Sequence, residues 1–331
     1  MSVRELANTE AMAEALKEEM ARDSSIFIVG EDLVSHGGIF GQFAGLPQAF
    51  PGRLIDTPIS ETAIVGAGLG AAITGMRPFV DLHFADFVTT AMDEIANQAA
   101  KIRYMFGGQV KVPLVIWAPD GGGFGAAAQH SQSLEAWFLH TPGLKVVVPC
   151  FPYDVKGLIK TALRDDDPIL FFMHKKAFAH KGPVPEEEYL IPLGKADCKR
   201  EGTDATVITY SRMVLHSLMA AEVLEKEGVS IEIIDLRTLW PMDWEAIARS
   251  VTKTNKAIVA HEACITGGAG AEIASRIQEG LFDWLDAPVI RVGGPRVPIP
   301  FSPPLENFVV PGPSSIVEAV HRLLGKKGAE S

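Results

Sequence analysis

Two residues stand out as candidates for acid–base chemistry, Glu61 and His130. Upstream of Glu61, Thr57 predicts a helix cap and Pro58 the first helical residue, which places Glu61 in the first turn near the positive end of the helix dipole. The next turns are rich in glycine and alanine (66–72), although each glycine costs a helix about 1 kcal/mol relative to alanine. We infer that this helix packs closely against another backbone, a subunit or a ligand.

Each of the two residues has a plain interpretation and a catalytic one. Glu61 is either an ordinary first-turn glutamate, which this stretch alone favours, or a buried acid that holds a proton for a cofactor. His130 lies among Gly, Ala, Gln and Ser at the end of a glycine-rich segment. An imidazole suits proton transfer or the binding of a substrate carboxylate, but taken alone a hydrogen-bonded structural histidine is the simpler interpretation.

Two further groups of side chains invite a functional interpretation. Phe84, Phe87 and Tyr104 offer a stacking face to a heteroaromatic ring, or are core residues. The acidic run 165–167 follows a predicted helix, where the carbonyl groups already carry partial negative charge. Either a cation binds there, with oxygen ligands that include the carbonyls around 162–163, or the run is a solvated acidic turn.

Strands and helices alternate along the whole chain, which predicts an α/β fold with two open, mostly parallel sheets. The predicted strands are 25–32, 53–56, 77–87, 112–118, 145–149, 168–173, 205–210, 230–235, 257–260 and 289–292. The predicted helices are 1–23, the helix that carries Glu61, 89–106, 133–139, 153–164, 212–228, 243–252, 268–284 and 314–324. A segment rich in proline, glutamate and glycine predicts a linker over 186–202, between domains 1–185 and 203–331. Glu31 and Asp32 follow the first strand, where ligands gather in such sheets.

The composition excludes several classes of protein. With 331 residues, 47% hydrophobic and 21% charged, the chain is long enough for two globular domains. Its net charge of −11 argues against nucleic acid or an anionic membrane as a partner, and no apolar run approaches the ~20 residues of a membrane span. The three cysteines have no Cys-x-x-Cys spacing, so we expect a cytoplasmic protein without a structural zinc site.

These landmarks, in this order, resemble the β subunit of thiamine-diphosphate-dependent 2-oxoacid dehydrogenase complexes of the pyruvate, branched-chain and acetoin types. The matching motifs are Gly30–Asp32, Gly37–Phe40, Asp56–Glu61, Phe84–Phe87, His130–Ser133, Pro142–Val146, Lys156–Leu158, Asp235–Leu239 and Ser250–Thr254. The similarity covers almost the whole chain. It implies a transketolase-like pyrimidine-binding domain followed by a transketolase C-terminal-type domain.

The resemblance also implies roles for single residues. Glu61 matches the glutamate that hydrogen-bonds the aminopyrimidine ring of thiamine diphosphate and so promotes loss of the thiazolium proton. His130 matches a histidine near the reacting carbon. Further cofactor-contacting positions correspond to Glu31, Ile59, Ser60, His83 and Phe87. Relatives hold a structural potassium ion at positions that correspond to Val112, Leu114, Ala162, Leu163, Asp165 and Asp167.

One absence and several departures refine this expectation. The chain contains no Asn-Asn pair, so it lacks the family's magnesium–diphosphate motif. We therefore expect a larger α subunit to hold Mg²⁺ and the diphosphate, in a heterotetramer of two α and two β chains. His83, Trp117, Met173 and Arg296 depart from the family's usual residues, and His83 and Trp117 lie close to the expected pocket in sequence.

The expected reaction is decarboxylation of a 2-oxoacid, or cleavage of a ketone such as acetoin, with transfer of the acyl group to lipoamide on a dihydrolipoyl acyltransferase core. The alternatives are a thiamine-dependent lyase or transketolase-like half-enzyme that does not use lipoamide, and a structural subunit that has lost its chemistry. The sequence leaves the substrate open.

Overall fold

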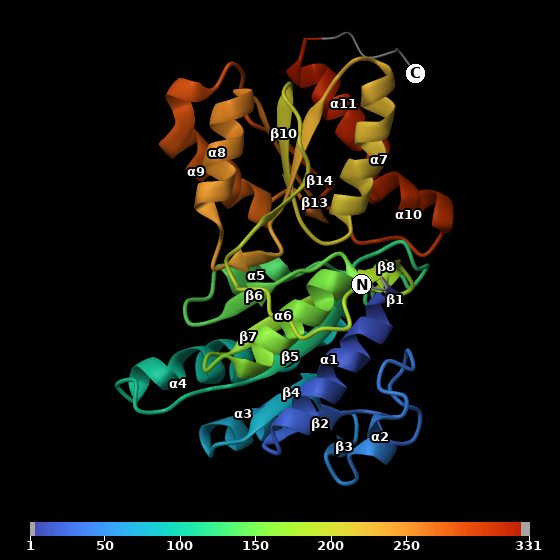
Figure 1. Cartoon of the computed structure of the whole chain (residues 1–331), viewed down its shortest axis with the longest axis vertical. Coiled ribbons are helices and arrows are strands. Elements are labelled where there is room, and N and C mark those ends of the chain that lie inside the picture. Colours follow the sequence, from blue (N-terminus) through green and yellow to red (C-terminus); the bar gives the residue numbers. More distant parts are fainter. Residues whose placement is uncertain (1–3, 326–331) are drawn as a thin grey trace. The chain divides into compact units, whose positions relative to one another are not determined.

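The computed structural model describes residues 4–325, which form two compact units (Figure 1). The first unit comprises the chain up to Asp120 together with Trp137–Leu193, and the second comprises Gly121–Ala136 and the chain from Gly194 onward. The segment 121–136, predicted within the first domain, is thus grouped with the second unit. The expected α/β class is confirmed. Residues 1–3 of the predicted first helix and the outer ends of both predicted domains lie outside the described residues.

The sheet of the first unit has its strands in the order β6-β7-β5-β4-β2-β3, and all of these pairs are parallel. Its strands are β2 (Ile26–Gly30), β3 (Leu54–Asp56), β4 (Arg77–Asp81), β5 (Val115–Asp120), β6 (Lys145–Val147) and β7 (Ile169–His174). A separate antiparallel pair joins β1 (Arg4–Ala7) to β8 (Lys181–Val184). Because residues 4–7 form β1, the first helix begins at Asn8.

Two helices, α1 (Asn8–Arg22) and α6 (Pro152–Arg164), cover one face of this sheet with apolar side chains (Figure 1). Leu16 of α1 and Leu158 of α6 are fully buried there with Trp117 of β5, and each such side chain contributes about 2–3 kcal/mol of transfer free energy. Trp117, which the sequence placed near the pocket, is therefore a core residue. Its ring stacks on those of Phe79 and Phe178.

Helix α3 (Glu61–Ile73) packs through its small residues against the sheet of its own unit. A Cβ atom at Gly68 would lie 2.5 Å from Cγ2 of Val80 in β4, so glycine is required for this approach. The close contact at Gly68 is therefore with side chains of the chain's own sheet, and the approach of another backbone, a subunit or a ligand to this helix stays a prediction. A Cβ at Gly70 would meet nothing within 4 Å, so the outer side of the helix is open.

The predicted start of α3 is wrong by three residues. Thr57 does not cap the helix, because its backbone N–H and its hydroxyl both donate to the carbonyl of Gly30, at 2.9 and 3.2 Å. This contact continues the pairing of β3 with β2 and leaves Pro58 in a loop. The helix begins at Glu61, with Ser60 as its cap residue.

The other short elements of the first unit are irregular. The predicted strand 77–87 ends at Asp81 and is followed by a 3₁₀ turn, η1 (Ala85–Thr89). The predicted helix 89–106 consists of a π-helical stretch, η2 (Asp93–Ala99), and α4 (Ala100–Met105). The remaining helical segments are α2 (Leu46–Ala49), α5 (Glu135–Leu139), which begins in the second unit, and η3 (Lys175–Ala177).

The second unit has a sheet in the order β14-β13-β10-β11-β9, parallel except for β9. Helices α7 and α11 lie on one side of it and α8 and α9 on the other (Figure 1). The strands of this sheet are β9 (Asp197–Arg200), β10 (Ala205–Thr209), β11 (Ile231–Asp235), β13 (Ala257–Cys264) and β14 (Ile290–Gly294), and the unit also contains β12 (Thr238–Trp240), which is not part of this sheet. The helices are α7 (Met213–Lys226), α8 (Trp244–Thr254), α9 (Ala269–Leu281), η4 (Phe282–Trp284), α10 (Pro303–Val309) and α11 (Pro313–Leu323).

The expected cytoplasmic location rests on two features of the sequence, the lack of an apolar run long enough for a membrane span and its cysteines. Among residues 4–325, no helix has the length and apolar character needed to cross a membrane. Cys150, Cys198 and Cys264 are free thiols. The cytoplasmic location stays a prediction.

Candidate functional site

Three carboxyl groups meet where parallel strands of the first unit end. Glu31 follows β2, Asp81 is the last residue of β4, and Glu61 is the first residue of α3. Strands β2 and β4 are adjacent and parallel, so their carboxyl ends lie at the same edge of the sheet. A Cβ atom at Gly30 would lie 2.9 Å from Cβ of Asp81, so glycine allows the two strand ends to approach closely.

His83 links these groups. Its Nδ1 lies 3.4 Å from Oε2 of Glu31, its Nε2 lies 3.0 Å from the carbonyl oxygen of Glu31, and its backbone N–H donates to Oδ1 of Asp81 at 2.8 Å. His83 and Asp32 both have φ of 54°, a left-handed conformation that costs free energy for residues other than glycine. We call Glu31, Glu61, Asp81 and His83 the strand-end cluster.

Two carboxyl groups of the strand-end cluster, those of Glu31 and Asp81, have raised pKa values. Burial raises the pKa of Asp81 to about 7, and the neighbouring His83 opposes this rise. Burial also raises the pKa of Glu31; the charge of His83 opposes the rise and the charge of Glu61 adds to it. Two carboxyl groups with perturbed pKa values beside one imidazole are typical of a functional site.

Glu61 is the member of this cluster whose carboxyl group has no hydrogen-bond partner among the described residues. Its side chain is only 8% exposed, yet it makes no hydrogen bond with any residue in the described range 4–325. Its carboxyl oxygens are not among the fully buried atoms that lack a partner, so they keep access to solvent and an external donor or acceptor can reach them. Beside it, Ile59 is 80% exposed and Ser60 is exposed, so both predicted contact residues face outward.

The aromatic residues of the expected stacking face separate into two groups. Phe84 and Phe87 pack edge to face with ring centroids 5.9 Å apart, and Phe87 is half-buried. The ammonium group of Lys175 lies 5.5 Å from the centroid of the Phe84 ring. Tyr104 is 88% exposed on α4, so it is neither a core residue nor part of this aromatic pair. Met173, one of the departures, is fully buried in the core.

His130 belongs to the second unit, in the segment 121–136. It is partly buried, near the end of a loop that a hydrogen bond from the N–H of Gly121 to the carbonyl of Gln132 closes at 3.3 Å. A pocket of about 380 Å³ in the same unit is lined by 131–134, 262–264 and 294–299. Arg296, which departs from the family's usual residue, thus lines a pocket next to the loop that carries His130.

The acidic run after α6 is neutralised by side chains. Lys145 Nζ lies 2.7 Å from both carboxylate oxygens of Asp165 and 3.1 Å from Oδ2 of Asp167. Arg77 contacts Asp166 at 2.8 Å and donates to the backbone carbonyls of Leu163 and Asp165; Lys111 contacts Asp166, and Arg103 contacts Asp167. We call Asp165, Asp166, Asp167 and these four basic side chains the helix-end cluster.

The helix-end cluster therefore contains the positive charge that a helix C-terminus with three carboxylates requires. The hydrogen bond from Lys111 lowers the pKa of Asp166. Burial would raise the pKa of Asp167, but hydrogen bonds from Lys145 and Arg103 lower it overall. Sequence reasoning missed these basic residues, because each lies far along the chain from the acidic run.

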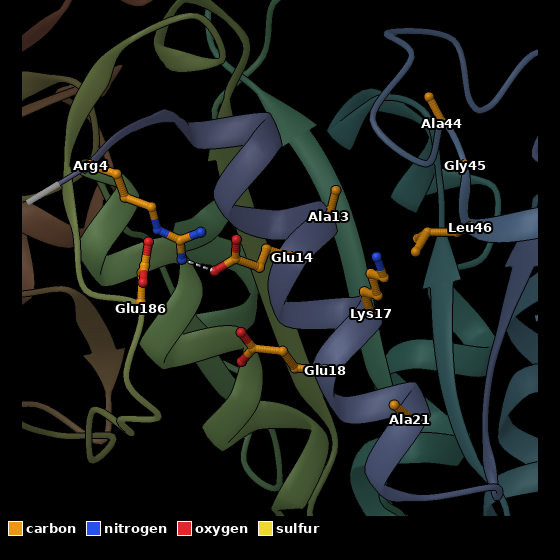
Figure 2. A pocket seen from close by; sticks show the side chains of 10 residues that line it. All are labelled: Arg4, Ala13, Glu14, Lys17, Glu18, Ala21, Ala44, Gly45, Leu46 and Glu186. Atoms are coloured by element: carbon orange, nitrogen blue, oxygen red, sulfur yellow. Dashed lines mark hydrogen bonds and ion pairs between the residues drawn. The ribbon is translucent and has the colours of Figure 1, made fainter. Parts of the chain in front are cut away.

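A larger pocket of about 630 Å³ lies beside α1 and residues 44–46 (Figure 2). Two of its acidic side chains, Glu14 and Glu18, already have partners. Glu14 bonds to Arg4 and, at 2.5 Å, to the buried Lys156, and Glu18 bonds to Lys156 and Lys160 at 2.8 and 2.6 Å. These ion pairs join α1 to α6, so we assign them a structural role.

Comparison with known proteins identifies the family and supports the fold. Residues 4–181 match the family described as "Transketolase, pyrimidine binding domain" and residues 194–316 match "Transketolase, C-terminal domain". A solved structure of a split-gene transketolase, an inactive β4 tetramer, has a TM-score of 0.79 and 24% identity and covers 98% of this chain and 99% of its own, which shows the shared fold.

Three similar relatives are named as β subunits. The 2-oxoisovalerate dehydrogenase subunit beta of Bacillus subtilis is 48% identical over 93% of this chain and 95% of its own length. The acetoin:2,6-dichlorophenolindophenol oxidoreductase subunit beta of the same species is 44% identical over 98% of each chain. The pyruvate dehydrogenase E1 component subunit beta of Gracilaria tenuistipitata var. liui is 43% identical over 95% of this chain and 98% of its own. The chain therefore belongs to the transketolase-like family of β subunits of 2-oxoacid and acetoin dehydrogenases.

Proposed function

We propose that this chain is the β subunit of a thiamine-diphosphate-dependent dehydrogenase that acts on a 2-oxoacid or on acetoin and transfers the acyl group to lipoamide. The observation that carries the proposal is the carboxyl group of Glu61, which is buried and has no hydrogen-bond partner among the described residues. The names of the relatives favour a dehydrogenase over a lyase that does not use lipoamide.

The strand-end cluster suits the binding of an aminopyrimidine ring. When bound, thiamine diphosphate supplies a carbon acid whose conjugate base attacks the substrate carbonyl. Glu61 would hold a proton at a ring nitrogen. Glu31 would keep the surroundings of Glu61 poor in negative charge, since burial raises its own pKa. Phe87 and the exposed Ile59 would supply apolar contacts to the ring.

A separate α subunit would complete the site. This chain has no Asn-Asn pair, and its relatives are named as one subunit of a larger enzyme. We therefore propose that Mg²⁺ and the diphosphate are held by an α chain in a heterotetramer of two α and two β chains, with a dihydrolipoyl acyltransferase core as the further partner. The outer side of α3 and the exposed Ile59 offer apolar surface for the α chain.

We also propose a structural potassium ion at the helix-end cluster. The carbonyl oxygens of Leu114 and Ala162 accept hydrogen bonds from Ile169 and Asp165, and each keeps a second lone pair. Carbonyl oxygens of Val112 and Leu163 and the carboxylates of Asp165 and Asp167 would complete the ligand set. Because Lys145 and its neighbours already neutralise the carboxylates, an ion of single charge fits this site better than a divalent one.

Glu61→Gln tests the function directly. We expect this variant, co-expressed with its α subunit, to lose at least ~100-fold in turnover, the low end of what a positioned acid–base group contributes. Turnover would be measured with pyruvate, branched 2-oxoacids and acetoin and an artificial electron acceptor. The control is Glu222→Gln, an exposed glutamate on α7, which should leave turnover unchanged. Full turnover and full cofactor affinity in Glu61→Gln would refute the assignment.

A further inference from the structure

The loop that carries His130 has an unusual backbone. Gly121, Gly123 and Gly125 have φ between 68° and 83°, and Ala127 has φ of 60°. Repeated left-handed residues prevent this stretch from forming a helix or a strand, so its N–H groups need other partners. The stretch between Asp120 and Glu135 contains no helix or strand whose backbone hydrogen bonds could include these N–H groups.

Two glutamates of the second unit supply these partners. Oε1 of Glu262, in β13, accepts from the N–H of Gly122 at 2.6 Å. Glu306, in α10, accepts with both oxygens, from Gly123 at 2.7 Å and from Gly125 at 3.0 Å. Glu306 is only 2% exposed, and hydrogen bonds from N–H groups to a carboxylate are stronger than those to neutral acceptors.

A third contact fixes the other end of the segment. The hydroxyl of Tyr210 donates to Oε1 of the buried Glu135 at 2.6 Å. The ring of Tyr210 in turn stacks on His261, with centroids 6.2 Å apart. His130 thus lies between two anchored stretches, 122–125 and Glu135, and both anchors belong to the second unit.

We infer that Glu306 and Glu262 are positioning residues that set the location of His130, an inference that rests on the proposed function of that histidine. The C-terminal-type unit therefore takes part in the reaction through its own side chains, in addition to any role in assembly. The carboxylate form matters because both oxygens of Glu306 accept. In a glutamine, the amide –NH₂ would face one of the N–H groups and lose that bond.

The test uses Glu306→Gln and Glu262→Gln, with Glu306→Asp as the conservative variant and Glu222→Gln as the control. In the full-length chain, we expect amide hydrogen exchange at Gly122–Gly125 to be roughly tenfold faster in Glu306→Gln, and less so in Glu262→Gln. In the assembled enzyme, kcat should fall about 10- to 100-fold, as expected for a displaced catalytic group, while cofactor affinity is kept. His130→Ala should show the same pattern of kcat loss.

The outcomes separate this inference from the proposed function. Unchanged exchange at Gly122–Gly125 and unchanged kcat in Glu306→Gln would overturn the positioning role, whatever Glu61→Gln does. Faster exchange with unchanged kcat would also overturn it, because the loop would then be held without consequence for the reaction. Equal loss of kcat and cofactor affinity would make Glu306 merely structural. Partial recovery of kcat in Glu306→Asp, which keeps both acceptor oxygens, would support the inference.

Discussion

The first unit contains two acidic clusters that behave in opposite ways. In the strand-end cluster, the pKa values of Glu31 and Asp81 are raised, and a single imidazole faces them. In the helix-end cluster, the pKa values of Asp166 and Asp167 are lowered by lysine and arginine side chains. Both clusters are rich in carboxyl groups, and they differ in the basic residues that surround them.

The difference shows what each cluster is suited to do. Carboxylates paired with Lys145 and Arg77 hold the end of α6 to the neighbouring segments. Carboxyl groups without such partners are costly, since burial without compensation destabilises the charged form. A cluster in which carboxyl groups stay buried at this cost in free energy is a candidate catalytic or binding site, because proteins keep destabilised groups mainly where function requires them.

The largest difference should be seen in the pH dependence of stability. Asp81 holds its proton in the folded chain up to a pH of about 7 but loses it near 4 when unfolded, so its contribution to stability falls as the pH rises through this window. Asp81→Asn should remove this loss of stability. Above a pH of about 7, the free energy of unfolding of the variant should therefore exceed that of the unmodified protein by at most about 4 kcal/mol. Asp166→Asn should show the opposite sign, because a lowered pKa stabilises above a pH of about 4 and this gain is lost as the pH falls. Denaturant unfolding at several pH values measures both, and equal slopes for the two variants would contradict the comparison.

A smaller effect is expected when a cation of the helix-end cluster is removed. Lys145→Met leaves Asp165 and Asp167 without their shared lysine and should lower the free energy of unfolding by about 1–3 kcal/mol. Lys111→Met is the matched control, since this exposed lysine should contribute less than about 1 kcal/mol. Turnover of the folded Lys145→Met enzyme should equal that of the unmodified enzyme. A loss of turnover without a loss of stability would mean that this cluster also serves the reaction.

The smallest effect concerns potassium. We expect KCl to raise the melting temperature of the chain slightly relative to NaCl at the same ionic strength, through binding linkage worth less than ~1 kcal/mol. Asp165→Ala should abolish the difference. The proposed potassium site would have to be abandoned if the unmodified protein melts at the same temperature in both salts.

Sequence reasoning predicted the fold and placed Glu31 at a strand end because both depend on local patterns, whereas His83 entered through the family resemblance and Asp81 was not among the predicted site residues. Apolar runs separated by glycine and polar residues located β2 and β4, and the residues after such strands lie at a common edge. Sequence reasoning failed where contacts between residues distant in sequence determine the local structure. Pairing of β3 with β2 extends through Thr57 and delays α3, and no local feature of Lys145 indicates that it reaches the acidic run. The burial of Trp117 depends in the same way on the packing of its neighbours.

The loop that carries His130 is held by residues that are synthesised much later than the loop itself. Glu262 and Glu306 lie 140 and 183 residues further along the chain than the glycines that they hold. A ribosome makes the loop early and these partners late. A product of premature termination before Glu306 would carry Glu61, the strand-end cluster and the loop, yet would lack the carboxylate that fixes the loop. Such a fragment contains most of the site's residues without the means to set His130.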